Sequence, residues 1–245
     1  MMRRFRDRFA RRLRRLVRPA WLGTLRRTRP LSDRWGADRG TPLDRYYIEG
    51  FLADHRADIR GRVLEVKDSG YTVRFGTAVE THDVLDIDAH NPHATIIADL
   101  TVADAIPSER YDCFILTQVL QSIFDTPAAI AEAHRILKPA GVLLVTVPAV
   151  SPVIESGDYW RFTAMACQAL FADAFGAERV EVRSYGNVLS AIAFLAGMAW
   201  EELSRRELDV QDDRHPLLVA VRAVKSSAGG VHAGRGRADA SDGGG

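Results

Sequence analysis

The sequence predicts an α/β fold, with short, mostly parallel strands in one sheet and helices on both of its faces. Between residues 62 and 224, short apolar segments typical of buried strands alternate with longer segments of helical period. Two of the apolar segments end in an acid, at Asp88 and Asp99. The chain has 245 residues, 47% of them hydrophobic, which is enough for one well-buried domain with extensions.

The first half of the predicted domain, which spans residues 31–225, contains one helix and a series of strands. The helix covers 43–59, with Pro42 at its start and Gly61 after its end. The strands are expected at 62–66, 84–87, 94–98 and 111–116. Only residues 67–83 separate the first two strands, so we expect the helix that normally joins parallel strands to be missing there.

The second half alternates helices and strands up to residue 224. Asp125 is a suitable N-cap for a helix, and Pro127 suits its first turn. Residues 138–141 (KPAG) break that helix, and Gly176 is expected to end the next one. The helices are expected at 126–137, 163–175 and 188–203, and the strands at 142–147, 179–185 and 217–224.

The two terminal segments differ in composition from this domain. Residues 1–30 contain twelve arginines and one acid, a net charge of +11, so the rest of the chain carries about −10 of the formal +1. Within residues 3–18, apolar side chains recur at helical spacing, which suits a helix lying on an anionic membrane surface or on an acidic partner. A solvated basic tail is the alternative. Residues 226–245, rich in Gly, Ala, Ser and Asp, are expected to be disordered.

Compartment and redox state are inferred from several further features. The N-terminal apolar residues are separated by arginines, unlike the core of a secretion signal, and no stretch approaches the roughly 20 apolar residues that span a bilayer. Cys113 and Cys167 are too few for a disulfide framework and lack metal-ligand spacing. We therefore expect a reduced, cytoplasmic protein without a metal, which residues 3–18 could hold at the inner membrane surface.

The predicted domain is organised around the segment Gly61–Phe75. An apolar strand over 62–66 contains Glu65, and the turn of residues 67–70 (KDSG) follows it. In an open α/β sheet, ligands bind just beyond the carboxyl ends of the strands. The turn is therefore expected to border a binding site, as the remnant of a nucleotide-type loop with fewer glycines than usual.

Two further segments resemble sequences of the class I S-adenosylmethionine-dependent methyltransferases, in particular bacterial, type-11-like members. Residues 134–144 (HRILKPAGVLL) look like the turn before the fifth strand of that family. Residues 158–163 (DYWRFT) are similar to a segment after that strand in members often associated with glycan or small-molecule modification. The resemblance covers roughly residues 44–225. It implies a Rossmann-like sheet of seven strands with an antiparallel last strand, and S-adenosyl-L-methionine as cofactor.

The resemblance also implies roles for residues at the strand ends. Asp88 would accept hydrogen bonds from the ribose hydroxyls of the cofactor, or else cap the following loop. Asp99 and Leu100 would border the adenine, with a helical N-cap as the alternative role for Asp99. The other residues expected to bind the cofactor, beside its methionine moiety or at the end of the fourth strand, are Glu65, Asp68, Gly70, Thr117 and Gln118.

The sequence indicates no catalytic base. Methyl transfer from a sulfonium is an in-line displacement, so it requires neither a metal nor a covalent nucleophile. Asp158 and Arg161 are the candidates to orient or deprotonate an acceptor. An internal ion pair between them is the alternative.

Departures from the family pattern leave two functions open. The family loop is usually E-x-G-x-G-x-G, but Lys67 stands at the first glycine position and Gly70 is the only nearby glycine. We expect a methyltransferase acting on a small-molecule or glycan-type acceptor. The alternative is a non-catalytic binding or scaffold protein of the same fold, with the arginine-rich segment as its contact. A nucleic-acid substrate is not favoured, because the body is acidic and shows no base-flipping motif.

Overall fold

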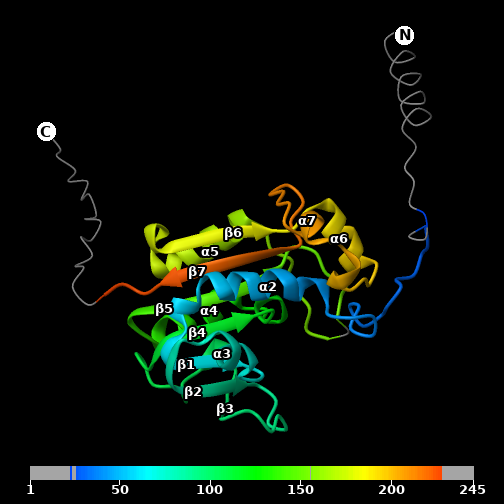
Figure 1. Cartoon of the computed structure of the whole chain (residues 1–245). Coiled ribbons are helices and arrows are strands. Elements are labelled where there is room, and N and C mark those ends of the chain that lie inside the picture. Colours follow the sequence, from blue (N-terminus) through cyan, green and yellow to red (C-terminus); the bar gives the residue numbers. More distant parts are fainter. Residues whose placement is uncertain (1–22, 24–25, 155, 228–245) are drawn as a thin grey trace, which may run out of the picture.

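A seven-stranded sheet forms the centre of the computed structural model, which describes residues 23, 26–154 and 156–227 (Figure 1). The strands are β1 (Arg60–Val66), β2 (Ala78–Asp86), β3 (Ile96–Ile97), β4 (Tyr111–Thr117), β5 (Leu137–Pro148), β6 (Val180–Tyr185) and β7 (Leu218–Val224). Their order across the sheet is β3-β2-β1-β4-β5-β7-β6. The pairs among β1 to β5 are parallel, whereas β7 runs antiparallel to β5 and β6. The predicted fold class, including the antiparallel last strand, is confirmed.

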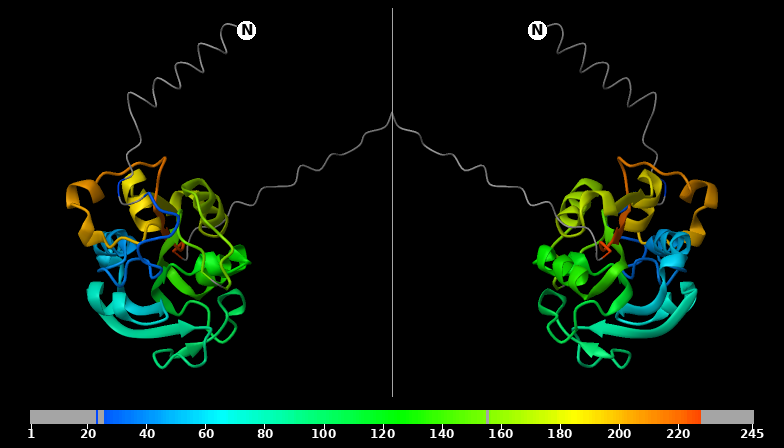
Figure 2. Two further views of the ribbon diagram at one scale, coloured as in Figure 1. Left: turned by 90° about the vertical axis from the view of Figure 1, so that its right-hand side faces the viewer. Right: turned by 90° about the vertical axis from the view of Figure 1, so that its left-hand side faces the viewer.

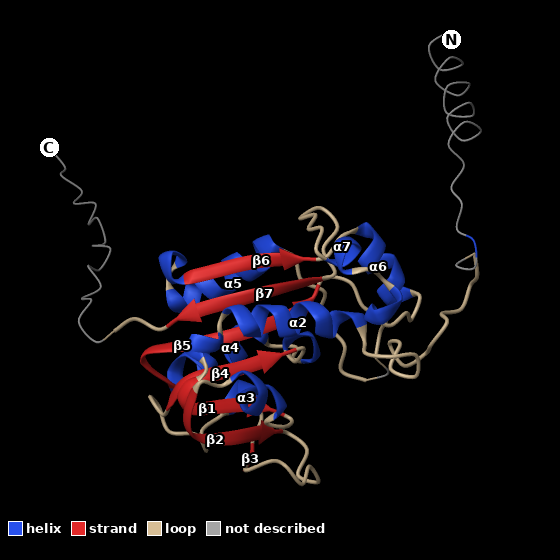
Figure 3. Cartoon of the chain, viewed as in Figure 1, coloured by secondary structure: helices blue, strands red, loops and turns tan. Residues whose placement is uncertain are grey.

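Helices lie on both faces of this sheet (Figures 2 and 3). Those in the described residues are α2 (Leu43–Asp54), α3 (Gly70–Phe75), α4 (Thr126–Ile136), α5 (Ala164–Phe175), α6 (Val188–Leu195) and α7 (Arg205–Leu208). The apolar core on one face contains side chains of α4 and α5, and the core on the other contains side chains of α2 and α6. The sheet is therefore the middle of three layers.

Strand β4 illustrates how the sequence builds these layers. Phe114 and Leu116 belong to the core with α4 and α5, while Cys113 and Ile115 belong to the core with α2 and α6. All four side chains are fully buried. Because successive side chains of a strand point to opposite faces, a strand buried on both faces needs a continuous apolar run. That run is the signal that made β4 predictable.

The segment between β1 and β2 differs from the prediction. Helix α3, six residues long, is present where we expected none. Strand β2 begins at Ala78 rather than at Val84 and ends at Asp86 rather than before Asp88. Its first half is polar and largely exposed but pairs with β1 from Arg60 onward, so an apolar pattern could not reveal it. Helix α3 fits between β1 and β2 because it has only six residues and begins directly after the turn.

Other predicted boundaries also differ from the structure. The helix predicted over 43–59 ends at Asp54, and the one predicted over 188–203 ends at Leu195. Gly197, with a φ of +74°, takes the left-handed conformation that stops α6. Residues 138–141, predicted to break the helix ahead of a strand over 142–147, lie inside β5, where the pairing with β4 shifts register.

The terminal predictions lie outside the described residues. These are the amphipathic helix over residues 3–18 and most of the tail over 226–245. Within the described ranges, no helix combines the length and apolar character needed to cross a bilayer. In the same ranges, no cluster of His, Cys, Asp and Glu side chains is arranged to hold a metal ion.

Helix α3 depends on the carboxylate of Glu65 in β1, which is only 2% exposed. Its oxygens accept hydrogen bonds from the N–H of Tyr71 (3.0 Å), the N–H of Thr72 (2.8 Å) and the hydroxyl of Thr72 (2.7 Å). Burial raises the pKa of Glu65, and the bonds from Thr72 and Tyr71 oppose that rise. A strand side chain thus satisfies the first N–H groups of a helix that is too short to be stable alone.

Removing this acceptor is expected to destabilise the protein. Glu65→Leu keeps the approximate size but leaves the donors on Tyr71 and Thr72 without a partner, so we expect a loss of about 2–4 kcal/mol in the free energy of unfolding, measured by urea denaturation. Glu65→Gln keeps one acceptor oxygen and should lose less. The control is Glu80→Gln on the exposed part of β2, expected to change stability by less than about 0.5 kcal/mol. A Glu65→Leu variant as stable as this control would contradict the role of Glu65.

Candidate functional site

A cavity of about 690 Å³ lies at the carboxyl ends of β1, β2 and β4. This is the edge at which open α/β sheets bind ligands, and the volume is in the range of small-molecule sites. Seven of the eight residues predicted to bind a cofactor line it, namely Glu65, Asp68, Gly70, Asp99, Leu100, Thr117 and Gln118. The fold therefore brings together segments that are far apart in the sequence.

Asp88 is the predicted residue that does not line the cavity, and Asp86 lines it instead. Because β2 ends at Asp86, Asp88 lies in the exposed loop beyond, where it accepts a hydrogen bond from the N–H of His90 (2.9 Å). Asp86 is 9% exposed and accepts from the N–H of Asp88 (3.0 Å) and from Asn91 Nδ2 (2.6 Å). Burial pushes the pKa of Asp86 up, but these hydrogen bonds hold it below its usual value, so Asp86 is an anion.

Lys67 keeps a glycine-like backbone at the first position of the loop. Its φ is +75°, in the left-handed region that costs a residue with a side chain about 1–2 kcal/mol. The N–H of Lys67 donates to the carbonyl of Leu85 (3.0 Å), and its carbonyl accepts from Asn91 Nδ2 (2.6 Å). The turn therefore holds a shape that glycine would adopt more easily, with a cationic side chain added at the cavity wall.

Asp99 and Leu100 form the part of the wall next to β3. Asp99 caps the short turn Leu100–Val102, since its Oδ1 accepts from the N–H and the hydroxyl of Thr101 (2.8 Å each). The predicted alternative, an N-cap, is thus present. Because these bonds use one carboxylate oxygen, the cap is compatible with a ligand contact by the other.

Gln118 and Gln121 supply buried polar atoms that have no partner in the described part of the chain. The unpaired atoms are Gln118 Nε2 and Gln121 Oε1, and both residues line the cavity. Gln118 directly follows β4 with a φ of +54°, and its N–H donates to the carbonyl of Thr146 (2.7 Å). Buried polar groups without partners cost free energy. A polar ligand in the cavity would offset that cost.

The cavity wall carries both signs of charge. Its acids are Glu65, Asp68, Asp86 and Asp99, and its cations are Arg45, Lys67 and Arg74. Arg45 comes from α2 and donates to the hydroxyl of Tyr71 (2.8 Å), another wall residue. Arg45, Tyr71, Asp86 and Gln121 were not predicted as site residues. For Arg45 no sequence signal was available, because only the packing of α2 places it there.

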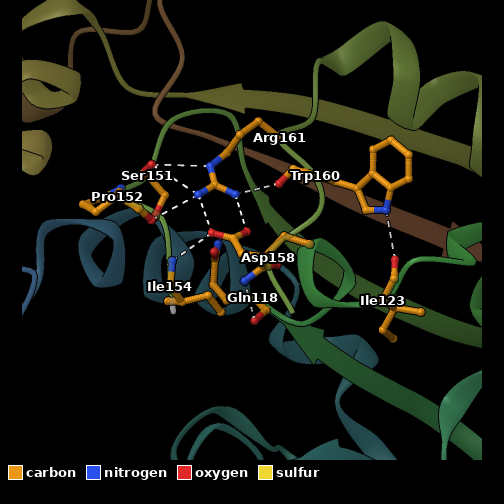
Figure 4. A network of polar contacts seen from close by, with 9 residues as sticks. Gln118, Ile123, Ser151, Pro152, Ile154, Asp158, Trp160 and Arg161 are labelled. Carbon is orange, nitrogen blue, oxygen red and sulfur yellow. Dashed lines mark hydrogen bonds and ion pairs between the residues drawn. The ribbon is translucent and has the colours of Figure 1, made fainter. Parts of the chain in front are cut away.

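Asp158 and Arg161 form an internal ion pair (Figure 4). Arg161 Nη1 and Nη2 donate to the two oxygens of Asp158 (2.5 and 2.7 Å), whose side chain is 3% exposed. Asp158 also accepts from the N–H of Ile154 (3.0 Å), and Arg161 donates to the carbonyls of Ser151 (3.3 Å) and Pro152 (3.1 Å). The guanidinium holds the pKa of Asp158 below its usual value. Both oxygens of Asp158 are thus engaged by groups of its own loop, which is the ion-pair arrangement named as the alternative.

Three exposed aromatic residues, Phe124, Tyr159 and Trp160, form a cluster beside the cavity. The ring of Phe124, which is 70% exposed, lies 5.4 Å from that of Tyr159 and 6.0 Å from that of Trp160 between centroids. The indole N–H of Trp160 donates to the carbonyl of Ile123 (3.0 Å; Figure 4), and the N–H of Tyr159 donates to that of Gln121 (2.8 Å). Ile123 and Gln121 both line the cavity, so this aromatic cluster is attached to its wall.

Residues 43–174, more than half of the chain, match the model of a protein family described as a methyltransferase domain. No curated protein sequence matches the chain significantly. The matched range runs from α2 through α5 and includes every cavity residue named above.

Solved structures resemble this one at low sequence identity. The [4+2]-cyclase SpnF is 17% identical, with a TM-score of 0.52 over 77% of this chain and 85% of its own. An S-adenosylmethionine-dependent methyltransferase from Mesorhizobium loti is 15% identical (TM-score 0.51; 75% of this chain and 100% of its own). One from Archaeoglobus fulgidus is 12% identical (TM-score 0.50; 74% and 94%).

At these identities the likeness concerns the fold alone, and a cyclase among the similar structures illustrates that one fold hosts more than one chemistry. The fold is that of the S-adenosylmethionine-dependent methyltransferases. The family match and the sheet order agree, and on the match over residues 43–174 the chain belongs to the methyltransferase-domain family.

Proposed function

We propose that this protein binds S-adenosyl-L-methionine in the cavity and transfers its methyl group to a small-molecule or glycan-type acceptor. The observation that carries the proposal is the anionic Asp86 at the end of β2, in the wall of a cavity of suitable size. A carboxylate at this strand end is placed to accept hydrogen bonds from two neighbouring ribose hydroxyls. The membership of the family supports the same assignment.

The rest of the wall suits the remaining parts of the cofactor. S-adenosyl-L-methionine carries a carboxylate, an ammonium group and a sulfonium, and the wall offers both cations and acids to such a ligand. Leu100 offers an apolar surface to the adenine, and the unpaired amide of Gln118 offers hydrogen bonds. Lys67 lies in the loop assigned to the methionine moiety, where it could pair with the carboxylate. The residues present thus fit the cofactor despite the missing glycines.

When bound, S-adenosyl-L-methionine supplies an electrophilic methyl group on a positively charged sulfur. The task of the chain is then to hold the acceptor in line with that group and to exclude water. Glu65 is engaged at the start of α3 and Asp158 with Arg161, so neither is assigned as a base. In this proposal, the protein therefore promotes transfer by positioning the acceptor and the cofactor, without an assigned base.

The aromatic cluster is the proposed contact for the acceptor. Phe124, Tyr159 and Trp160 are all exposed; Tyr159 and Trp160 donate to carbonyls of the cavity wall, and the ring of Phe124 packs against both. Exposed aromatic faces bind flat or ring-shaped ligands, including sugars, with little loss of side-chain entropy. Their position at the rim allows an acceptor to contact the rings and reach into the cavity.

Calorimetric titration tests the cofactor assignment. We expect the protein to bind S-adenosyl-L-methionine, and Asp86→Asn to weaken binding at least tenfold, because a hydrogen bond to a charged group contributes about 1.5–3 kcal/mol. Asp88→Asn, two residues further along and outside the cavity, is the matched control and should bind like the wild type. If the folded wild-type protein does not bind the cofactor at millimolar concentration, the proposal is wrong and the alternative of a non-catalytic scaffold protein is favoured.

Substitution of Asp158 tests whether it fixes the loop or acts as a base. Asp158→Asn should lower the free energy of unfolding by about 1–3 kcal/mol, since a charged acceptor of three hydrogen-bonding groups is lost. Proteolysis after Arg161 should become faster, while cofactor affinity stays within about twofold. The exposed Asp173→Asn is the control. Unchanged stability together with lost transferase activity would instead make Asp158 the base.

Methyl transfer itself can be followed with S-adenosyl-L-methionine labelled in its methyl group and a cell extract as the source of acceptors. Label is expected in the small-molecule or glycan fraction and not in the nucleic-acid fraction. Phe124→Ala should reduce this transfer at least fivefold without changing cofactor affinity, because the ring is largely exposed and Phe124 does not line the cavity. Equal transfer by Phe124→Ala and the wild type would rule out the aromatic cluster as the acceptor contact.

A further inference from the structure

Helix α6 presents an apolar face to the solvent. The side chains on this face are Val188, Leu189, Ile192 and Leu195, with exposed fractions between 40% and 53%. Ala193 and Phe194 on the opposite side are buried in the core. Surface helices of soluble domains normally turn polar residues outward, yet residues 188–200 include no charged residue. A continuous exposed apolar face of this kind marks a contact surface.

The N-terminal part of the chain joins the domain beside this helix (Figure 1). The N–H of Leu31 donates to the carbonyl of Ala196, just after α6 (2.7 Å). The backbone of Gly36 lies against that of Met198, close enough that a Cβ on Gly36 would meet the Met198 carbonyl oxygen at 2.6 Å. The preceding residue, Trp35, is 38% exposed. Tryptophan is enriched at membrane–water interfaces, so the edge next to α6 has a second feature of a lipid contact.

The same part of the chain carries most of the positive charge. Residues 1–30 have a net charge of +11, and Arg26, Arg27 and Arg29 are exposed where the chain approaches α6. Within residues 3–18, apolar side chains recur at helical spacing among the arginines. Among the described residues that line the cavity, Arg45 comes first in the chain. The charge of this segment is therefore not explained by the cavity.

We propose that the α6 face, Trp35 and the exposed Arg26, Arg27 and Arg29 bind the surface of an anionic lipid bilayer. The other arginines of residues 1–30 add positive charge to this contact. The apolar side chains of α6 would insert among the headgroups, and the arginines would lie over the negative charge of the lipids. Each contact alone is weak and reversible. Because the apolar face and the arginines belong to one chain, binding of either to the membrane raises the effective concentration of the other there.

Charge favours a bilayer over two other occupants of the α6 face. Residues 3–18 folded back on α6, or a second copy of the chain, would also bury the apolar side chains. Residues 188–200 carry no charge, so at this face neither occupant would meet a negative partner for the net charge of +11. Two copies joined at α6 would also bring two such segments together. An anionic bilayer offers an apolar interior to the α6 side chains and negative headgroups to the arginines at one surface.

Flotation of the full-length protein with vesicles tests this proposal. We expect binding to vesicles of phosphatidylcholine with about one third phosphatidylglycerol, at least tenfold weaker binding to phosphatidylcholine alone, and weakening by salt. Ile192→Glu/Leu195→Glu should reduce binding to the anionic vesicles at least tenfold, because two charges then lie on the inserting face. Val102→Glu/Met165→Glu is the matched control, since Val102 (63% exposed) and Met165 (84% exposed) lie outside this edge.

A second variant tests the arginines in the full-length chain. Replacing Arg11, Arg12, Arg14 and Arg15 by Ser should remove most of the salt dependence and lower the affinity for anionic vesicles at least tenfold. Thermal melting of every variant verifies that the fold is intact. Wild-type affinity in the α6 variant would overturn the proposal, because the arginines alone would then account for binding. So would a protein dimer, detected by light scattering, that the α6 variant dissociates while vesicle binding is absent.

Discussion

The buried carboxylate of Glu65 is the interaction on which the cavity depends. It lies at the end of β1 and holds the first N–H groups of α3, so the chain must turn sharply between the two elements. This turn forces Lys67 into a left-handed conformation and places Asp68 to accept a hydrogen bond from the N–H of Gly70 (2.8 Å). Because the capping carboxylate stands at the carboxyl end of a central strand, the same residue that builds the loop also places it at the ligand-binding edge.

The other side of the cavity is built by different means. There the chain after β5 is tied down by the ion pair of Asp158 and Arg161, which engages main-chain groups at Ser151, Pro152 and Ile154. Arg161 also donates to the carbonyl of Trp160 (2.8 Å), which connects the ion pair to the aromatic cluster. The proposed lipid contact lies on yet another part of the molecule, at α6. The proposed cofactor site and the proposed lipid contact thus lie on separate elements of one domain.

Much of the fold and part of the site were predictable. Strands β4 and β5 contain buried apolar runs at residues 113–116 and 142–145. The turn before Val142 resembles its family counterpart, so the sheet and its last antiparallel strand were expected correctly. The short polar elements were not predicted. Helix α3 is capped by the Glu65 carboxylate, and the first half of β2 pairs with β1 although it has no apolar face. Asp86 and Asp88 are two residues apart, so pattern alone could not tell which of them ends the strand.

Local composition therefore determined the layers of this protein, because burial on both faces of a sheet demands apolar runs whatever the surrounding chain does. It also located the edge of the sheet that bears the cavity, since parallel strands align their carboxyl ends. Three-dimensional packing decided the identity of the wall residues. The pairing of β2 with β1 places Asp86 at the cavity, and the packing of α2 places Arg45 there. Helix α6 stops at the turn of Gly197, and its apolar face stays exposed. These outcomes depend on contacts between distant segments, and such contacts leave no periodic trace in the sequence.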